Sequence, residues 1–167
     1  MRILVDSREQ QPFAFTKYEV TTEVIALPVG DYSLPGFQDR VAIERKELND
    51  LIACLMNGNR ERFERELYRG KHHDLFVVVV EASLNDVLHG RYKSEMKAHA
   101  AMQSLMAFTV RYGTSFIWAG TRAGAEYVTY SLLTKYLYEL KKRFNLATQA
   151  QGELGKVGQR RYPEEVT

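Results

Sequence analysis

The chain has 167 residues, of which 45% are hydrophobic and 26% charged, the balance of a globular domain that can bury a core. Its single cysteine, Cys54, excludes a disulfide framework and a zinc site built from cysteines. A formal net charge of +2 neither indicates nor excludes a nucleic-acid partner. No apolar run approaches the roughly 20 residues of a membrane span, and the N-terminus reaches a carboxylate too early for a secretory signal. We therefore expect a soluble, cytoplasmic protein without a membrane partner.

The first third of the chain is predicted to form strands and then helices. Short apolar or alternating stretches bounded by turn residues predict four strands: residues 2–5, 23–27, 31–34 and 40–46. After Lys46 the apolar spacing changes to three and four residues, which predicts two helices. The first covers residues 48–55 and is ended by Asn57-Gly58-Asn59, and the second is the highly charged stretch 60–69, stopped by Gly70.

The remainder of the chain alternates strands and helices. Residues 75–80 form an uninterrupted apolar run, typical of a central strand covered on both faces. A short helix, a long helix, a short strand and a last long helix follow: residues 83–88, 94–112, 116–118 and 121–144. This order predicts an α/β fold with a central mixed β-sheet flanked by helices. Because apolar content falls beyond residue 147, we expect residues 1–147 to form one domain and residues 148–167 a flexible polar tail.

A group of acidic and basic residues on the predicted strands could carry chemistry. Glu44 and Lys46 are two residues apart on a strand, so their side chains share one face. A carboxylate can hold a hard divalent cation, while an amine beside it can orient water and offset charge on a phosphodiester. Since Mg²⁺ needs six oxygens, Asp6 at the end of the first strand and Asp31 at the start of another are natural further ligands. Taken singly, each residue is more often a turn or surface residue.

Three segments of the chain resemble the nuclease domain of the XPF family: Val5-Asp6-Ser7-Arg8-Glu9, Val29-Gly30-Asp31-Tyr32 and Glu44-Arg45-Lys46-x-x-x-Asp50. These structure-specific endonucleases carry the signature GD-x(n)-ERK-x(3)-D, and the resemblance extends from Arg2 to about Trp118. It implies a restriction-endonuclease-like core. It also implies a DNA endonuclease that uses Mg²⁺ or Mn²⁺ and cuts at flaps, forks or other branched junctions.

The resemblance implies a role for each motif residue. Asp6, Asp31 and Glu44 would bind the metal ion, and Lys46 would orient the attacking water and face the phosphate.

Arg45 and Asp50 complete the signature and are included in the predicted catalytic set. Arg45 alternates to the other face of the strand, so we expect an internal ion pair, with Asp50 in the first helical turn as its partner. A purely structural arginine is an equal alternative. Glu9 either supports the metal ligands or is a solvated loop residue, and the sequence does not decide between these.

The charged helix over residues 60–69 is the expected DNA contact. Three of its arginines recur at intervals of three and four residues and form one stripe: Arg62, Arg65 and Arg69. Arg60, at the helix start, resembles the family's basic position near the active site and is the preferred phosphate contact. The alternative is an exposed helix held by the ion pairs Arg62–Glu66 and Glu61–Arg65.

The last predicted helix has a wide apolar and aromatic face, formed by Tyr127, Tyr130, Leu133, Tyr136, Leu137 and Leu140. Core packing is the default explanation, but XPF-like nuclease domains pair through helices in this region, so the resemblance implies a possible homodimer.

The glycines at 120 and 124 lack the spacing of a dinucleotide-binding motif, so no nucleotide cofactor is expected. The polar tail is too short for the helix-hairpin-helix module usual in the family, which predicts a stand-alone enzyme of prokaryotic or phage type.

Two other functions remain open from the sequence. The first is a non-catalytic DNA-binding partner in a nuclease heterodimer, although such a subunit would be expected to have lost the GD or ERK residues. The second is a restriction or repair-type nuclease that shares the core but has no preference for junctions.

Overall fold

The computed structural model describes residues 1–159, with side chains to residue 151. Residues 1–133 form one compact unit, and the chain from Thr134 onward belongs to a second. We describe each unit by itself.

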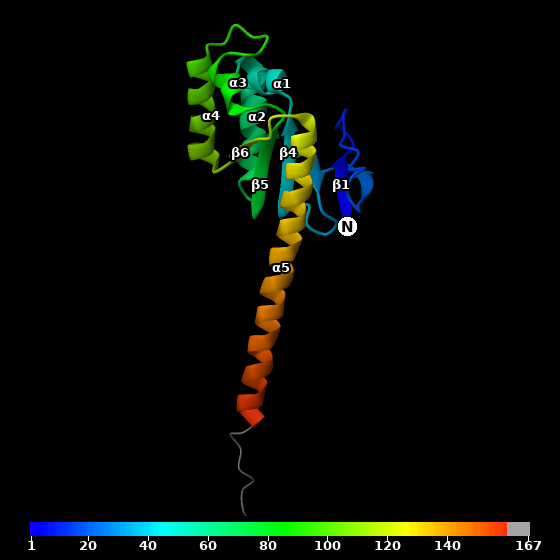
Figure 1. Cartoon of the computed structure of the whole chain (residues 1–167). Helices are drawn as coiled ribbons and strands as arrows, with labels where there is room; N and C mark the ends of the chain where they lie inside the picture. The colour runs from blue at the N-terminus through cyan, green and yellow to red at the C-terminus, as the bar shows by residue number, and fades with distance from the viewer. Residues whose placement is uncertain (160–167) are drawn as a thin grey trace, which may run out of the picture. The chain divides into compact units, whose positions relative to one another are not determined.

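A six-stranded sheet lies at the centre of the first unit (Figure 1). In spatial order its strands are β2 (Thr21–Ile25), β1 (Arg2–Asp6), β3 (Tyr32–Ser33), β4 (Val41–Lys46), β5 (Leu75–Val80) and β6 (Ser115–Trp118). Only β3 is antiparallel to its neighbours; the other neighbouring pairs are parallel. The carboxyl ends of β1, β4 and β5 therefore share one edge of the sheet with the amino end of β3. The mixed α/β sheet predicted from the sequence is confirmed.

Four helices join one face of the sheet: α1 (Leu48–Ala53), α2 (Asn57–Gly70), α3 (Leu84–Leu88) and α4 (Ala98–Tyr112). Their apolar side chains form one buried cluster with alternate residues of β5. In α2 the buried positions are Phe63, Leu67 and Gly70, the spacing of one helix face. A Cβ at Gly70 would overlap the Phe76 ring, so the glycine allows the end of α2 to approach β5 closely.

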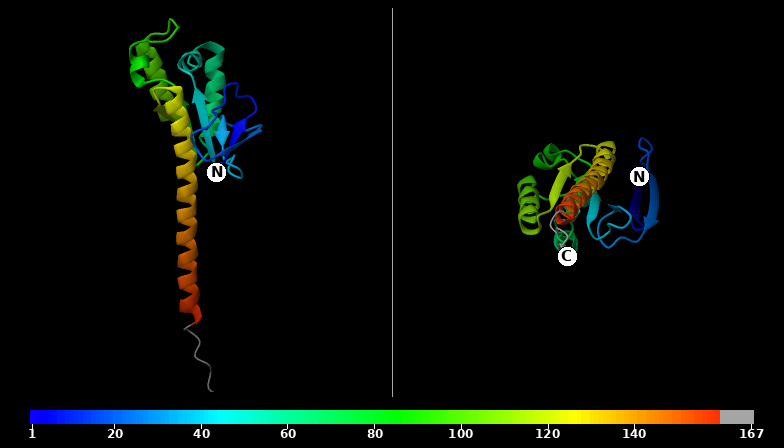
Figure 2. Two further views of the ribbon diagram at one scale, coloured as in Figure 1. Left: turned by 45° about the vertical axis from the view of Figure 1, so that its right-hand side comes forward. Right: turned by 90° about the horizontal axis from the view of Figure 1, so that it is seen from below.

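The opposite face is covered by residues 13–18 and by the first turns of α5 (Arg122–Gln159), which Figure 2 shows on the other side of the sheet from α2. Register partners supply the central side chains of this face: Val5, Tyr32, Ile43 and Val77. The Phe13 ring stacks on Tyr32, with ring centroids 5.1 Å apart. Tyr130 of α5 stacks on Tyr18 at 4.1 Å. These contacts fix the start of α5 against the sheet.

Two helix boundaries differ from the sequence expectation. Asn57 and Gly58 do not end a helix; they begin α2, after the extended Met56. The last helix continues past Phe144 to Gln159, so residues 148–159 of the predicted tail are helical. Low apolar content argues against burial of this stretch but does not exclude a helix, which forms here although three glycines, at 152, 155 and 158, disfavour it. Residues 160–167 of the predicted tail lie outside the described residues.

The helices of residues 1–159 include none that is both long and apolar enough to cross a membrane.

Candidate functional site

A pocket of about 450 Å³ lies where the loop after β1, the start of β3, the end of β4 and the helices α1 and α2 meet. Charged side chains dominate its lining: Arg8, Glu9, Asp31, Glu44, Arg45, Lys46, Asp50, Arg62 and Glu66. The topology explains this position, because β4 ends and β3 begins at the same edge of the sheet. The structure therefore brings together most of the predicted site residues.

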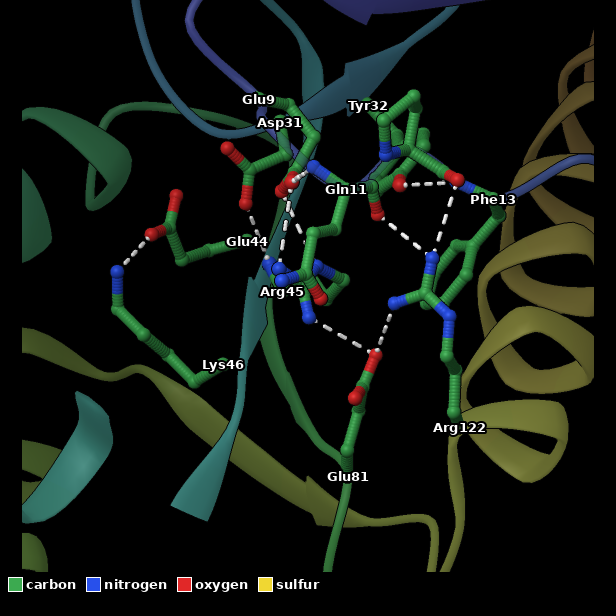
Figure 3. Close-up of polar contacts among 11 residues, drawn as sticks. Glu9, Gln11, Phe13, Asp31, Tyr32, Glu44, Arg45, Lys46, Glu81 and Arg122 are labelled. Carbon is green, nitrogen blue, oxygen red and sulfur yellow. Dashed lines mark hydrogen bonds and ion pairs between the residues drawn. The ribbon is translucent and has the colours of Figure 1, made fainter. Parts of the chain in front are cut away.

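Glu44 and Lys46 project from one face of β4 into this pocket, as predicted. The Lys46 ammonium forms an ion pair with Glu44 Oε1, and the other Glu44 oxygen has no hydrogen-bond partner within residues 1–159 (Figure 3). Glu44 is only 3% exposed. Burial raises its pKa well above the ordinary value, the nearby Asp31 charge raises it further, and Lys46 opposes both. A carboxyl with one oxygen that faces the pocket without a protein hydrogen bond is suited to an incoming cation.

Lys46 stays protonated in this pocket. Burial alone would lower the pKa of its ammonium, but the negative charges of Glu44 and Glu66 outweigh burial, and the pKa is raised. Lys46 can therefore donate hydrogen bonds to a phosphate oxygen or to water, but it has no lone pair with which to accept a proton.

The main chain of β4 holds Asp31 beside Glu44. The Arg45 amide donates to Asp31 Oδ2 at 2.8 Å, and the Asp31 amide donates to the Ile43 carbonyl at 2.8 Å. Gly30 precedes it with φ of +73°, and a Cβ there would lie 3.1 Å from the Ile43 oxygen. Only glycine fits this left-handed, close approach, which explains the Gly30-Asp31 pair. Burial raises the pKa of Asp31 to about 6, and the charges of Glu9 and Glu66 contribute in the same direction.

Arg45 forms an internal ion pair, but not with Asp50. Its Nε and Nη2 donate to Glu9 at 3.1 and 3.2 Å, and its Nη1 donates to Glu81 at 2.9 Å. The predicted Arg45–Asp50 pair is wrong, because the guanidinium donates its hydrogen bonds to Glu9 and Glu81. Asp50 instead lies exposed at the pocket rim in the first turn of α1.

This ion pair extends to the start of α5. Arg122 donates to Glu81 at 2.9 Å and to the carbonyl oxygens of Gln11 and Pro12 at 2.7 and 3.1 Å (Figure 3). The network contains two arginines and two glutamates, so its charges balance. Because the Glu9 side chain is 5% exposed, it is not a solvated loop residue.

The structure does not bring Asp6 into the pocket lining. Its Oδ1 accepts hydrogen bonds from the Arg8 amide at 2.8 Å and from Arg8 Nε at 2.7 Å. Its Oδ2 accepts from Arg8 Nη2 at 2.8 Å and from the Leu27 amide at 2.7 Å. Burial raises the pKa of Asp6, but these hydrogen bonds outweigh burial and the pKa is lowered. In this structure both oxygens of Asp6 accept hydrogen bonds, and Asp6 anchors Arg8 and the loop after β1; its role as a metal ligand stays a prediction.

Arg60, the preferred phosphate contact in the sequence analysis, is occupied within the fold. Its Nε donates to Glu64 at 3.0 Å, and its Nη1 donates to the Leu55 carbonyl and to the Ser104 hydroxyl at 3.2 and 3.0 Å. The guanidinium also lies 4.7 Å from the Phe108 ring centroid. Arg60 therefore joins α2 to α4, and its role as a DNA contact stays a prediction.

The other predicted arginines of α2 differ in their surroundings. Arg62 lines the pocket and is exposed, and no ion pair is formed by it within residues 1–159. Arg65 is 4.0 Å from Glu61, a pair on the solvent side of the helix. Arg69 is exposed in the last turn. The predicted Arg62–Glu66 pair is not formed. Of the three arginines in this stripe, Arg62 is the one that lines the pocket, so it can contact a molecule bound there.

Sequence analysis missed Glu66 as a pocket residue. It treated Glu66 only as a partner for Arg62, yet the Glu66 charge raises the pKa of both Asp31 and Glu44. A signal was available: Glu66 follows Phe63 by three residues and precedes Leu67, which places it at the border of the buried face of α2.

The donor set at this edge of the sheet fits a hard divalent cation. Asp31 and Glu44 offer carboxylate oxygens, and Mg²⁺ typically binds one or two carboxylates while keeping waters and substrate phosphates. Within residues 1–159, no three Asp, Glu, His or Cys side chains already stand close enough to hold an ion. Two carboxylates completed by water and phosphate are therefore the arrangement that the residues favour.

The raised pKa of Asp31 predicts how stability depends on pH. Because its pKa is about 6 in the folded protein and ordinarily 3.8, the folded state holds a proton that the unfolded chain releases between these values. In EDTA, the stability from this group is therefore present at low pH and lost as pH rises through about 6. We expect Asp31→Asn to raise the free energy of unfolding at pH 7.5 by about 1–3 kcal/mol. Urea denaturation from pH 4 to 8 tests this; a constant difference between the two proteins across that range would contradict it.

Comparisons with known proteins agree with this fold. The family model of the ERCC4 domain matches residues 5–132. The solved structure of XPF from Aeropyrum pernix matches with a TM-score of 0.64 and 22% identity, over 90% of this chain and 73% of that chain. The structure of the same XPF in complex with DNA matches with a TM-score of 0.63 and 22% identity, over 83% of this chain and 66% of that chain. No curated protein matches significantly. Because the family model spans most of its length, the chain belongs to the ERCC4 domain family of XPF-like DNA nucleases.

Proposed function

We propose that the protein is a cytoplasmic, metal-dependent endonuclease that hydrolyses DNA at flaps, forks or other branched junctions. The observation that carries the proposal is the pair of raised-pKa carboxylates, the buried Glu44 and the half-buried Asp31, which lies beside a protonated lysine in an ERCC4 domain. An acidic pair of this kind destabilises a fold, so a functional reason for it is needed.

Asp31 and Glu44 would hold Mg²⁺ or Mn²⁺ at the pocket. When bound, such an ion offsets charge on the phosphate and lowers the pKa of a coordinated water. Lys46 supplies counter-charge to Glu44 and donates hydrogen bonds to a phosphate oxygen or the attacking water. Arg45 would hold the end of β4 in place through Glu9 and Glu81. Asp50 would also belong to the catalytic set, from its exposed position at the pocket rim.

Basic side chains at the pocket mouth would bind the DNA backbone. Arg62 is exposed there, and the Arg8 side chain is 71% exposed while Asp6 fixes its orientation. Phosphate contacts position a nucleic acid, and the interior carboxylates alone would repel it. Arg62 and Arg8 therefore supply the attraction that the interior lacks.

We propose further that a second copy of the chain covers part of α5. Between residues 134 and 151 three large apolar side chains are more than half exposed: Tyr138, Phe144 and Leu146. Apolar exposure on this scale is characteristic of an association surface. We expect sedimentation equilibrium to show a dimer and Phe144→Glu, a residue 71% exposed, to shift it to monomer. A wild-type protein that is monomeric at micromolar concentrations would contradict the homodimer.

Cleavage of end-labelled DNA tests the proposed activity directly. A 3′-flap duplex, a four-way junction and a matched linear duplex are incubated with Mg²⁺, Mn²⁺ or EDTA. We expect metal-dependent cutting, fastest on the branched substrates, and a loss of about 100-fold or more in Asp31→Asn because one carboxylate ligand is removed. Glu61→Gln, which changes a carboxyl 82% exposed on α2, is the matched control and should cut normally.

The result also separates the alternatives. If wild-type protein cuts no DNA yet binds as tightly as Asp31→Asn, it is a non-catalytic binding partner. Equal cutting of linear and branched DNA indicates a nuclease without junction preference.

Two arginines of α2 give a prediction about binding. Arg62→Ala should weaken DNA affinity several-fold without lowering the melting temperature, because Arg62 has no partner in the described fold. Arg60→Ala should lower the free energy of unfolding by about 1–3 kcal/mol, because it removes the link between α2 and α4 and leaves Glu64 less well paired. Fluorescence anisotropy at fixed salt and thermal denaturation measure the two effects. The reverse pattern would restore Arg60 as the phosphate contact.

A further inference from the structure

Glu66 is the one pocket carboxylate to which the proposed function gives no role. Phe63 and Leu67, which flank it on α2, are fully buried and fix the helix against the core. Glu66 therefore occupies a fixed position at the pocket wall, half-buried. Within residues 1–159 it forms no hydrogen bond and no ion pair, although Arg62 is available one turn earlier on the same helix. A rigidly placed, unpaired carboxylate facing other carboxylates has no structural explanation in the fold.

The charges around Glu66 do not balance. Its carboxylate acts electrostatically on Asp31 and Glu44, which are negative, and on Lys46 and Arg8, which are positive. Lys46 is already paired with Glu44, and Arg8 with Asp6. Apart from the Glu9–Arg45 ion pair and the exposed Asp50, Arg8 and Arg62, the charged side chains that line the pocket are three carboxylates and one ammonium, which is paired with Glu44. This excess negative charge is unfavourable in a partly desolvated site unless a cation compensates it.

An independent observation points to a ligand at the same place. The Glu44 side chain is 4% exposed, and one of its oxygens has no hydrogen-bond partner in the described chain, although the side chain lines the pocket. Asp31 also has one oxygen without a described partner, since only Oδ2 accepts the Arg45 amide. Two oxygens on the β-sheet side and the Glu66 carboxylate on the α2 side therefore line the same pocket.

We propose that Glu66 is an outer carboxylate of the divalent-cation site and raises its affinity from the side of α2 through a metal-bound water, since no three acidic side chains within residues 1–159 lie close enough to coordinate one ion directly. The inference rests on the proposed nuclease function. Arg62 lies one turn earlier on the same helix, so metal binding and the DNA-facing arginine would share one rigid element.

Isothermal titration calorimetry of the full chain with MnCl₂, and then with MgCl₂, tests the inference without reference to activity. We expect Glu66→Gln to weaken Mn²⁺ binding by about tenfold or more. Glu61→Gln is the matched control, because it removes the same charge from the same helix but on the solvent side, where the side chain is 82% exposed. It should bind Mn²⁺ as the wild type does.

Thermal unfolding distinguishes this role from a structural one. In EDTA, Glu66→Gln should melt at the same or a higher temperature than the wild type, because a repulsive charge is removed. With saturating Mn²⁺ its melting temperature should rise less than that of the wild type. A structural role predicts the opposite: lower stability in EDTA and an unchanged response to Mn²⁺.

Two outcomes would overturn the inference. One is Mn²⁺ affinity of Glu66→Gln within about twofold of the wild type, well short of the expected loss. The other is no Mn²⁺ binding by the wild type. Neither decides the nuclease function, which depends on whether wild-type protein cuts DNA with metal and not in EDTA; a cutting wild type with an unaffected Glu66→Gln would refute only the role of Glu66.

Discussion

The placing of two carboxylates side by side at one edge of the sheet is the constraint on which the site depends. Glu44 is buried and Asp31 half-buried, and this desolvation raises the pKa of both. Such an arrangement opposes folding, so the surrounding structure must hold it in place. The backbone of β4 does so, since the Arg45 amide fixes the Asp31 carboxylate and the Ile43 carbonyl fixes its amide. The antiparallel β3 and the left-handed Gly30 are the parts of the fold that make this close approach possible.

The two basic residues of the ERK motif divide structural and chemical roles between them. Arg45 enters a charge-balanced network with Glu9, Glu81 and Arg122, which ties the loop after β1, the end of β5 and the start of α5 to β4. The Arg45 side chain is 9% exposed, and replacing Arg45 would leave the buried Glu9 carboxylate without its charged partner. Lys46, one residue later, faces the pocket and is available to a substrate. Period-two alternation along one strand thus separates the rigid support from the reactive group.

Local sequence patterns predicted the features that depend on neighbouring residues, namely strand bounds and the face on which a side chain lies. The central strand over residues 75–80 was predicted with its observed bounds, and the shared face of Glu44 and Lys46 follows from the strand period alone. Ion-pair partners were not predictable in this way. Arg45 takes Glu9 and Glu81, each 36 residues away, instead of the nearby Asp50. Nor did the sequence indicate that Arg60 donates to Ser104, 44 residues later on α4. In both cases tertiary packing determines which of several possible partners a long side chain reaches.

The distribution of charge in the pocket gives a physical account of how a phosphodiester could be accepted there. The interior carries Asp31, Glu44 and Glu66, which repel a phosphate, while Arg62 and Arg8 at the mouth attract it. Without a cation, the Lys46 ammonium is engaged by Glu44. A divalent cation held by Glu44 would leave the Lys46 donors free for a phosphate oxygen. The same cation would offset the negative charge of Asp31, Glu44 and Glu66, so acceptance of a phosphodiester would depend on metal binding.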